Sequence, residues 1–508
     1  MKKFNGFVLF LVCRHGWRCL NALGGVFAKQ KLLSLISAGT LILNGCFSPY
    51  GADETNLTIS LGDMGRVAVA PTEIPNLSYE VILDGPGGRR TESFSGTSAS
   101  FRVRPGTYNI IVRAIGNRPS AYNITDFPNA RMLRGWGSTR VSIRPGGDNR
   151  ISLDMATATE VTNTAQFNVA LSQTLGTREH IIVIKGDNIT PAAFPSGTVT
   201  FVAEEARTID MSGSNFLVGN VLTLGKEGMG GTLTLDGNGG PGVGAGMPLI
   251  YVNGGELIMN EGVTLQGRVN PTGNNGGGVG VANTAGSKFI MNGGIILDNE
   301  IIGGNGGGVF VDGIFTMNGG IIRGNTASWG GGVFVNGTFN MNDGIIERNI
   351  AERGGGVNNW GIFNVERGII RNNRAVPTAT AFSSGGGVWT GGTFTVNNFI
   401  EISGNRAIST GSNSGNGGGI NWDGGNVLIN NCRITNNDAG RMGGGIHEDN
   451  ASWASDTFVI YAGLITENIA DVSFGGGGLW GFSGSFTNPI IINATVTGNT
   501  PNNGWIFD

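Results

Sequence analysis

The chain has 508 residues, of which 91 are glycine, and a formal net charge of −3. The glycines follow no Gly-X-Y period and there are only 16 prolines, which excludes a collagen-like fibre. Hydrophobic residues make up 39% of the chain, enough for a packed core, so the glycines indicate tight turns rather than disorder.

The first 45 residues have the pattern of an export signal. Lys29 and Lys31 precede an apolar run at 32–43, and a small residue, Gly45, comes directly before Cys46. This ending resembles the bacterial lipobox, which implies removal of residues 1–45 and lipidation of Cys46. An ordinary signal peptide or a membrane anchor is the alternative, although the apolar run is short for a spanning helix.

Loss of the signal segment changes the charge balance. Without residues 1–45 the chain keeps 27 basic and 36 acidic residues, a net charge of −9. This charge argues against nucleic acid as a partner and against binding to an anionic membrane surface, so the only expected membrane contact is a lipid at Cys46. With Cys46 acylated, only Cys432 remains. The sequence therefore predicts no disulfide framework, and alternation with Ile434 places Cys432 in the core.

After a short tether at 46–55, residues 56–155 alternate apolar and polar positions between turn signals. Short strands with regular turns predict a β-sandwich of about 100 residues. The segment around Pro105-Gly106-Thr107-Tyr108 resembles carboxypeptidase-regulatory and Cna-B-like surface modules, which implies a spacer or binding module there. No active site is expected in this region.

Residues 156–180 are predicted to be a linker and a capping helix. Phe167, Ala170 and Leu171 fall on one helical face within 164–175, with Thr164 as the expected cap and Gly176 as the stop. Such a helix would cover the first unit of the repeat region, which otherwise exposes unpaired backbone groups.

A single phrase recurs eight times between Gly276 and Asn499. It reads Gly-Gly-Gly-Val, then Gly-x-Phe, then Ile-Ile-x-x-Asn, and three of its closing asparagines (Asn325, Asn349 and Asn373) lie 24 residues apart. A fixed period of this length indicates stacked repeats, and 24 residues suit three short strands with three turns. The alternation in Val309-Phe310-Val311 and Val333-Phe334-Val335 predicts that these valines face inward and these phenylalanines outward. We also expect a ladder of stacked amides formed by Asn299, Asn325, Asn349, Asn373, Asn405, Asn437, Asn468 and Asn499.

These repeats resemble a known architecture. Residues 181–508 look like the pectin-lyase-like right-handed parallel β-helix, and the phrase is similar to the repeats of polymorphic outer-membrane proteins, whose motifs are Gly-Gly-Ala-Ile and Phe-x-x-Asn. Here Val, Ile or Leu follows the glycines, and the residue three before the asparagine is usually Ile. The resemblance implies an all-β protein: a right-handed parallel β-helix preceded by a small β-sandwich.

That superfamily includes polysaccharide lyases, glycosidases and non-catalytic adhesins, so chemistry must be sought in particular residues. Glycosidases need two carboxyl groups in proximity, and lyases of this kind need acidic calcium ligands with a basic proton abstractor. Asp423 and Asp449 occupy the same position in consecutive repeats, beside Trp422, His447 and Glu448. They are the candidate acid pair or calcium site; the alternative is that aspartates at turns bond the local backbone.

A second column of residues is aromatic. Phe310, Phe334, Trp389 and Trp480 are predicted to face outward in a flat row, with Trp422 nearby. Such a row could stack on sugar rings or contact a protein, or it could be ordinary stacking along a sheet.

Two further features are less specific. Arg323, Glu347 and Arg371 form an alternating charge column, the pattern of a solvated face. Polar inserts at 374–384 and 406–416 leave the same corner of consecutive repeats, so they should lie side by side and form one protruding surface, or else two independent loops.

Two functions follow from these features. The first is a lipid-anchored cell-envelope or outer-membrane surface protein with a structural or adhesive role, which binds glycan or host or matrix protein along an extended face without a cofactor. The alternative is a calcium-dependent polysaccharide lyase or glycoside hydrolase acting near Asp423 and Asp449.

Overall fold

The structure of the protein is a computed structural model. It describes residues 54–62, 76–173 and 178–501, except residues 188, 193–194, 196, 243–245, 272, 274, 379–381, 411–413, 450–455, 474 and 482–489. The export segment at 1–45, Cys46, nearly all of the tether and Gly176 lie outside these residues. Among the described residues, no helix is long and apolar enough to cross a membrane.

The N-terminal region consists of two β-sheets that share a core. The first has the strand order β4 (Ser98–Val103), β1 (Thr55–Leu61), β7 (Asn149–Leu153). The second places β3 (Gly88–Phe94), β2 (Ser78–Gly85), β5 (Gly106–Asn117) and β6 (Arg131–Ile143) side by side, all antiparallel. Alternate residues such as Ile59, Val81 and Ile110 are fully buried in the core that the two sheets share.

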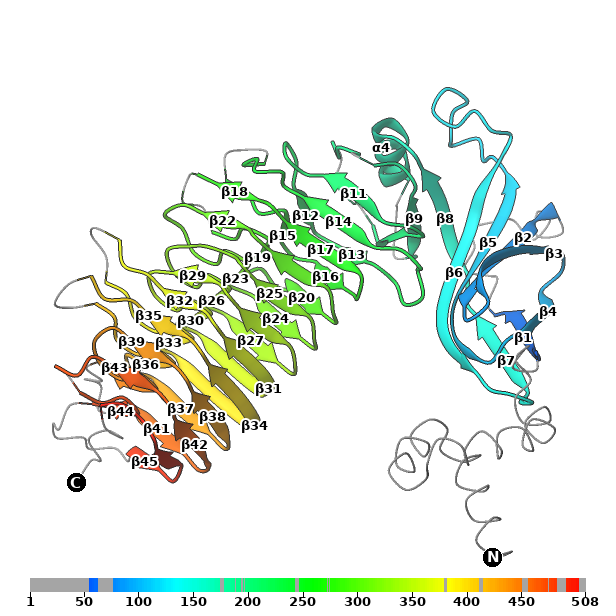
Figure 1. The fold of residues 1–508 in the computed structure, drawn as a ribbon. Coiled ribbons are helices and arrows are strands. Elements are labelled where there is room, and N and C mark those ends of the chain that lie inside the picture. Colours follow the sequence, from blue (N-terminus) through cyan, green and yellow to red (C-terminus); the bar gives the residue numbers. More distant parts are fainter. Residues whose placement is uncertain are drawn as a thin grey trace, which may run out of the picture.

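The N-terminal region is joined to the repeats through a shared sheet. Residues 156–161, expected to be part of a linker, form strand β8 (Ala156–Val161) instead, which pairs with β6 and continues in parallel into β9 (His180–Ile184) and β10 (Val199–Ala203). The antiparallel sheet therefore runs directly into the parallel one, as the ribbon shows between its cyan and green parts (Figure 1).

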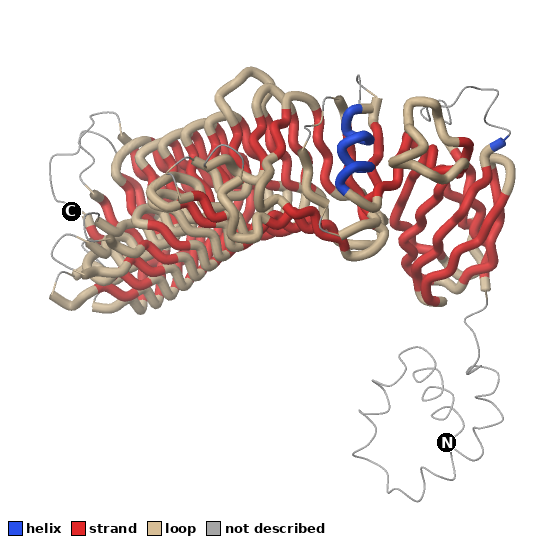
Figure 2. The backbone as a smooth tube through the Cα atoms, turned by 90° about the horizontal axis from the view of Figure 1, so that it is seen from above, coloured by secondary structure: helices blue, strands red, loops and turns tan. Residues whose placement is uncertain are grey.

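The expected helix lies at α4 (Thr164–Ser172), next to the first parallel strands (Figure 2). Its cap is Asn163 rather than Thr164: the Asn163 side chain accepts a hydrogen bond from the backbone N–H of Gln166 at 3.0 Å. Phe167 is buried against Phe201 and Phe216, with ring centroids 5.3 and 6.4 Å away, so the helix covers the end of the interior.

From residue 199 onward, each repeat contributes one strand to each of three long parallel columns. The first column is β10, β13 (Val221–Leu224), β16 (Glu256–Met259), β20 (Lys288–Met291), β24 (Ile314–Met317), β27 (Thr338–Met341), β31 (Ile362–Arg371), β34 (Thr393–Ser403), β37 (Asn426–Ile429), β41 (Thr457–Ile460) and β45 (Ile490–Ile492). The second is β11 (Arg207–Asp210), β14 (Leu233–Asp236), β17 (Val263–Gln266), β21 (Ile295–Leu297), β25 (Ile321–Arg323), β28 (Ile345–Glu347), the later halves of β31 and β34, β38 (Cys432–Thr435), β42 (Gly463–Thr466) and β46 (Thr495–Thr497).

The third column is a separate ten-stranded sheet. Its strands are β12 (Phe216–Val218), β15 (Ile250–Val252), β19 (Val279–Val281), β23 (Val309–Val311), β26 (Val333–Val335), β30 (Val357–Asn359), β33 (Val388–Thr390), β36 (Ile420–Trp422), β40 (Ile446–Glu448) and β44 (Leu479–Trp480). Short strands complete the corners: β18 (Val269–Asn270), β22 (Glu300–Ile301), β29 (Ile350–Ala351), β32 (Arg374–Ala375), β35 (Arg406–Ala407), β39 (Asp438–Ala439) and β43 (Ile469–Ala470). The protein is thus all-β with long, stacked parallel sheets, an arrangement compatible with a parallel β-helix (Figure 1).

The interior of the stack is apolar and built in columns. Val309 and Val311 are fully buried, as predicted, and five phenylalanine rings stack one above another with centroids 4.7 to 5.0 Å apart. These rings belong to Phe289, Phe315, Phe339, Phe363 and Phe394. Cys432 lies in the same core, as predicted, and burial raises the pKa of its thiol to about 12.

The predicted amide ladder is confirmed over its whole length. From Asn299 to Asn468, each asparagine donates its Nδ2–H to the Oδ1 of the next ladder asparagine at 2.9 to 3.0 Å. The same Oδ1 atoms also accept the backbone N–H of the preceding ladder residue. The glycine triplets pack against this ladder and against one another. A Cβ on Gly332 would stand 3.0 Å from Asn349 Nδ2 and 2.6 Å from the carbonyl oxygen of Gly356 in the next triplet, so no side chain fits there.

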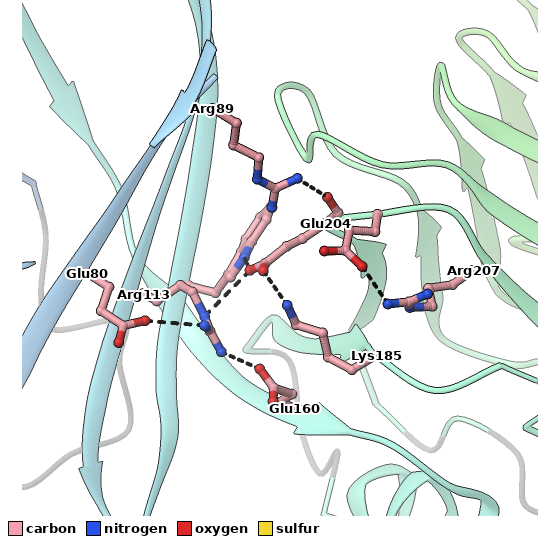
Figure 3. Close-up of polar contacts among 9 residues, drawn as sticks. Glu80, Arg89, Arg113, Glu160, Lys185, Glu204 and Arg207 are labelled. Atoms are coloured by element: carbon pink, nitrogen blue, oxygen red, sulfur yellow. Dashed lines mark hydrogen bonds and ion pairs between the residues drawn. The ribbon is translucent and has the colours of Figure 1, made fainter. Parts of the chain in front are cut away.

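A buried ionic cluster fixes the two regions to each other (Figure 3). The fully buried carboxylate of Glu204, just after β10, lies 2.7 Å from Lys185 Nζ and 3.6 Å from Arg113 Nε, and accepts the indole N–H of Trp136 at 3.0 Å. Burial raises the pKa of Glu204, but the charges of Arg113 and Lys185 outweigh it and hold the pKa below the usual range. Strands of both regions therefore depend on one carboxylate.

We predict that Glu204→Gln destabilises the protein by roughly 3–5 kcal/mol at pH 7, because it leaves Lys185 without its buried carboxylate and Arg113 with only the partly exposed Glu80 and Glu160. The pKa of Glu204 is lower in the folded than in the unfolded protein. The stabilisation from Glu204 is therefore present above its unfolded pKa of about 4.5 and is lost as the pH falls through its folded pKa. Urea unfolding of wild type and variant between pH 7 and pH 3 measures this difference.

The matched control is Glu205→Gln, because the neighbouring carboxylate is 57% exposed and pairs with Arg207 at 2.6 Å. An exposed pair contributes about 0–1 kcal/mol. Equal losses for the two variants, or a Glu204 effect that does not shrink in acid, would contradict the buried-cluster interpretation.

Candidate functional site

The candidate site lies on the outer face of the ten-stranded sheet. Most of its strands have three residues; the outer two, such as Val309 and Val311, belong to the core, and the middle one faces away from it. The middle residues pair in register along the sheet as Leu217, Tyr251, Gly280, Phe310, Phe334, Asn358, Trp389, Asn421, His447 and Trp480.

The predicted open row of aromatic side chains on this face is covered. Phe310 and Phe334 stack with centroids 5.4 Å apart, but they are only 9% and 7% exposed, and Trp389 is 1% exposed. These three rings face outward from the core, as predicted, yet a ligand cannot reach their faces.

The cover is a patch formed by Trp329, Arg353 and Trp360, which we call the tryptophan patch. The Trp329 ring lies 6.4 Å from Phe334, the Trp360 ring 4.5 Å from Trp389, and the Arg353 guanidinium stands 5.7 Å from Trp329 and 5.9 Å from Trp389. Such cation–π contacts hold the rings in place. Trp360 remains 44% exposed and Trp329 half-buried, so the accessible aromatic surface of this patch is made by these two rings.

The other two predicted binding residues have different surroundings. Trp422 is the third residue of its strand and lies in the core, packed on Phe458 at 5.0 Å, so its placement in a binding face is wrong. Trp480 is half-buried and stacks on His447, with ring centroids 5.1 Å apart and planes 10° apart.

The two aspartates do come together. Asp423 and Asp449 directly follow β36 and β40, which pair in register, and their backbone N–H groups donate to Thr390 and Trp422 carbonyls at 2.8 Å each. This places them one strand spacing apart, about 4.8 Å. Both side chains are half-buried at the same edge of the sheet.

The electrostatics link this acid pair to the tryptophan patch. Burial and, to a lesser extent, the Asp449 charge raise the pKa of Asp423, the Arg353 charge opposes them, and the net result is a pKa of about 6. Burial also raises the pKa of Asp449, against Arg353, the Asn421 amide and Arg441. Near neutral pH one carboxyl therefore holds its proton more readily than an ordinary aspartate.

His447 and Glu448 do not join the acid pair. His447 is completely buried, bonded through Nδ1 to Asn421 Oδ1 at 2.9 Å, and burial lowers its pKa to about 3, with Arg441 adding to the effect. Glu448 lies on the core-facing side of its strand, 4% exposed, and burial raises its pKa to about 7. Neither is placed to act on a ligand at the surface.

The acid pair is a poor calcium site. Arg353 and Arg441 lie close enough to lower the pKa of Asp449, and cations at that distance disfavour a divalent ion. Within the described part of the chain, no group of three or more His, Cys, Asp or Glu side chains could hold a metal. The residues therefore do not fit the calcium that the alternative function requires.

The two inserts lie side by side where they are described. Ser383 Oγ donates to the Ile408 carbonyl, and the Gly415 N–H donates to the Ser383 carbonyl at 2.9 Å. Phe382, beside these contacts, is 53% exposed. In the charge column, Arg371 Nε lies 2.8 Å from Glu347 Oε2. Arg371 is partly exposed but Glu347 is buried, so the prediction of a solvated charge column is wrong at Glu347.

The sequence interpretation missed the roles of Trp329 and Arg353. Both residues directly precede a glycine triplet in successive repeats and pair as an isolated bridge, so the positions align in the printed sequence. The aligned positions of Trp329 and Arg353 could therefore be read from the sequence. Strand alternation predicts only which strand residues face outward; it does not predict that these corner residues fold over them.

Comparison of the chain with known protein families, curated proteins and solved structures finds no match.

We predict that Asp423→Asn stabilises the protein at pH 8 by on the order of 1–2 kcal/mol and has little effect at pH 4. The folded pKa is raised, so ionising Asp423 costs stability as the pH rises from the unfolded value of about 3.8 through about 6. Thermal unfolding at the two pH values measures this.

Asp312→Asn is the control, because Asp312 has the same position in an earlier repeat and is followed in the column by Asn336 rather than by a second acid. A stabilisation at pH 8 that is no larger than that of the control would refute the coupling of Asp423 to Asp449.

Proposed function

We propose that the chain is an exported, lipid-anchored protein of the bacterial cell envelope with a structural or adhesive role. Its residues 56–155 would be a β-sandwich and residues 181–508 a right-handed parallel β-helix, resembling the pectin-lyase-like superfamily. The stacked parallel sheets and the continuous amide ladder support this architecture. The lipid anchor rests on the lipobox-like sequence that ends at Cys46.

The proposed ligand is a glycan or a host or matrix protein, bound along the outer face of the ten-stranded sheet. The single observation that carries this proposal is the Trp360 ring, which is 44% exposed and packs against Trp389. Trp389 in turn lies beneath the Arg353 guanidinium. Exposed aromatic rings that cannot move away lose little entropy on binding, and Trp and Arg are the residues that dominate binding energies. An indole face also stacks well on a sugar ring.

A glycoside hydrolase is the second candidate. It is favoured by one observation, the half-buried pair Asp423 and Asp449 at one strand spacing with a raised Asp423 pKa. Two carboxyl groups at about this separation can act as acid and nucleophile. A calcium-dependent lyase is less well supported, because the nearby arginines oppose a cation and His447 is buried.

We predict that Trp360→Ala lowers binding to the best ligand on a glycan and matrix-protein array at least tenfold, because it removes the exposed indole face. The control is Tyr461→Ala, which deletes a 53% exposed aromatic ring at a different corner and should leave binding within twofold. Surface plasmon resonance on the purified proteins, matched by thermal unfolding, measures both.

The proposal fails if Trp360→Ala binds as well as wild type, or if no array ligand binds. It also fails if the wild type releases reducing or unsaturated ends from a glycan panel and Asp423→Ala with Asp449→Ala abolishes that release, which would establish the enzyme instead.

The anchor has its own test. We predict that mass analysis of the mature protein finds Cys46 as a lipidated N-terminal residue, and that Cys46→Ser shifts the protein from the detergent phase to the aqueous phase. An intact, unlipidated chain that starts upstream of Cys46 would overturn this part of the proposal.

A further inference from the structure

A second amide ladder runs along the outside of the stack, at the corner between the first two strand columns. Asn292 Nδ2 donates to Asn260 Oδ1 at 2.9 Å, Asn318 to Asn292 at 2.8 Å, and Asn342 to Asn318 at 2.7 Å. Unlike the buried ladder, Asn292, Asn318 and Asn342 are exposed. We call these four asparagines the outer ladder.

The outer ladder is a preorganised polar surface. A primary amide has two N–H donors and two acceptor lone pairs, and a ladder contact uses one of each. Every step therefore leaves an N–H and a lone pair for a ligand, repeated at about 4.8 Å. Because neighbouring amides hold each other, little side-chain entropy remains to be lost on binding.

The outer ladder begins in a hollow between the N-terminal region and the stack. The hollow has a volume of about 580 Å³ and is lined by, among others, Asn109, Arg140, Lys226, Asn260, Glu261 and Asn292. Volumes of a few hundred Å³ are typical of small-ligand sites. Asn109 and Arg140 are paired neighbours on β5 and β6, so the hollow exists only because the two regions are joined.

The hollow is lined by two basic and two acidic residues, Arg140, Lys226, Glu227 and Glu261, and both basic side chains have a carboxylate beside them. Lys226 Nζ lies 2.9 Å from Glu179, and Arg140 Nη1 lies 3.9 Å from Glu261. A strongly charged ligand would have to displace one of these pairs, whereas a hydroxyl group can bond to amide and charged groups alike. The site therefore suits a neutral, hydroxyl-rich ligand better than an anion.

We propose that the hollow and the outer ladder form a binding site for a neutral, unbranched polysaccharide, whose end occupies the hollow while successive sugar hydroxyls bond to Asn292, Asn318 and Asn342. A sugar ring advances an extended chain by a distance comparable to the strand spacing, so each amide meets a new ring. This site is separate from the tryptophan patch, which lies on the third sheet, and does not depend on it.

The test is calorimetric titration of the purified protein with cellohexaose, maltohexaose and hexagalacturonate. We expect one of the two neutral hexasaccharides to bind, the charged one to bind at least tenfold more weakly, and Asn292→Ala with Asn318→Ala to lower the affinity at least tenfold. Arg140→Gln, on the opposite wall of the hollow, should weaken binding as well without touching the ladder.

Asn430→Ala is the matched control, because Asn430 is exposed at the same corner beyond Glu366, far along the stack, and should leave binding within twofold. The proposal is overturned if neither neutral hexasaccharide binds, or if the ladder variant binds as well as wild type. Binding that is lost in Trp360→Ala but kept in the ladder variant overturns this site alone and supports the tryptophan patch. The reverse pattern supports this site and shows that the patch does not bind these hexasaccharides.

Discussion

The buried amide ladder is the constraint on which the repeat region depends. Seven of its eight asparagines are completely buried, so each amide needs its neighbour to satisfy its hydrogen bonds. An unpaired buried amide costs about 1–3 kcal/mol. Each repeat must therefore place its asparagine in line with the asparagine of the next repeat. This requirement fixes the register of the strands between them.

The ladder also explains where the repeats are free to vary. Consecutive ladder residues are 26, 24 and 24 positions apart up to Asn373, then 32, 32, 31 and 31. The added residues within 374–384 and 406–416 leave the stack only after the short strands β32 and β35, which pair with each other, so the strands before and after them keep their pairing. In these two repeats the added length lies at one corner, next to the face that carries Trp360 and Arg353. Between Asn437 and Asn468 it lies at another corner, between β40, which ends at Glu448, and β41, which begins at Thr457.

Columns are the second consequence of a fixed register. Residues at the same position of successive repeats align in a row along the stack. Phenylalanine rings form such a row in the core, asparagine amides form rows at two corners, and residues of mixed type form a row on the ten-stranded sheet. Where that row changes from Phe334 to Asn358 and Trp389, the corner residues Trp329 and Arg353 fold over it. The accessible surface is therefore made by the corner rather than by the strand.

This distinction marks what could be predicted from the sequence. Periodicity placed the valines, the ladder asparagines and Cys432 correctly, because burial and hydrogen bonding act on each repeat in the same way. The same periodicity made Phe310 and Trp389 outward-facing but could not show that another side chain covers them. It also placed Trp422 in a binding face, although the register puts that ring in the core. The cluster around Glu204 escaped prediction because Arg113, Lys185 and Glu204 are far apart in the chain and meet only through the continuous sheet.

The most direct measurement is hydrogen–deuterium exchange of the purified protein with and without the best ligand from the array. If the outer face of the ten-stranded sheet is the recognition surface, ligand protection will include the segment from Trp329 to Trp360 and leave the N-terminal sheets from 76 to 153 unchanged, apart from the strands around Asn109 and Arg140 if the ligand also occupies the hollow. Protection restricted to the N-terminal sheets would contradict recognition by the stack.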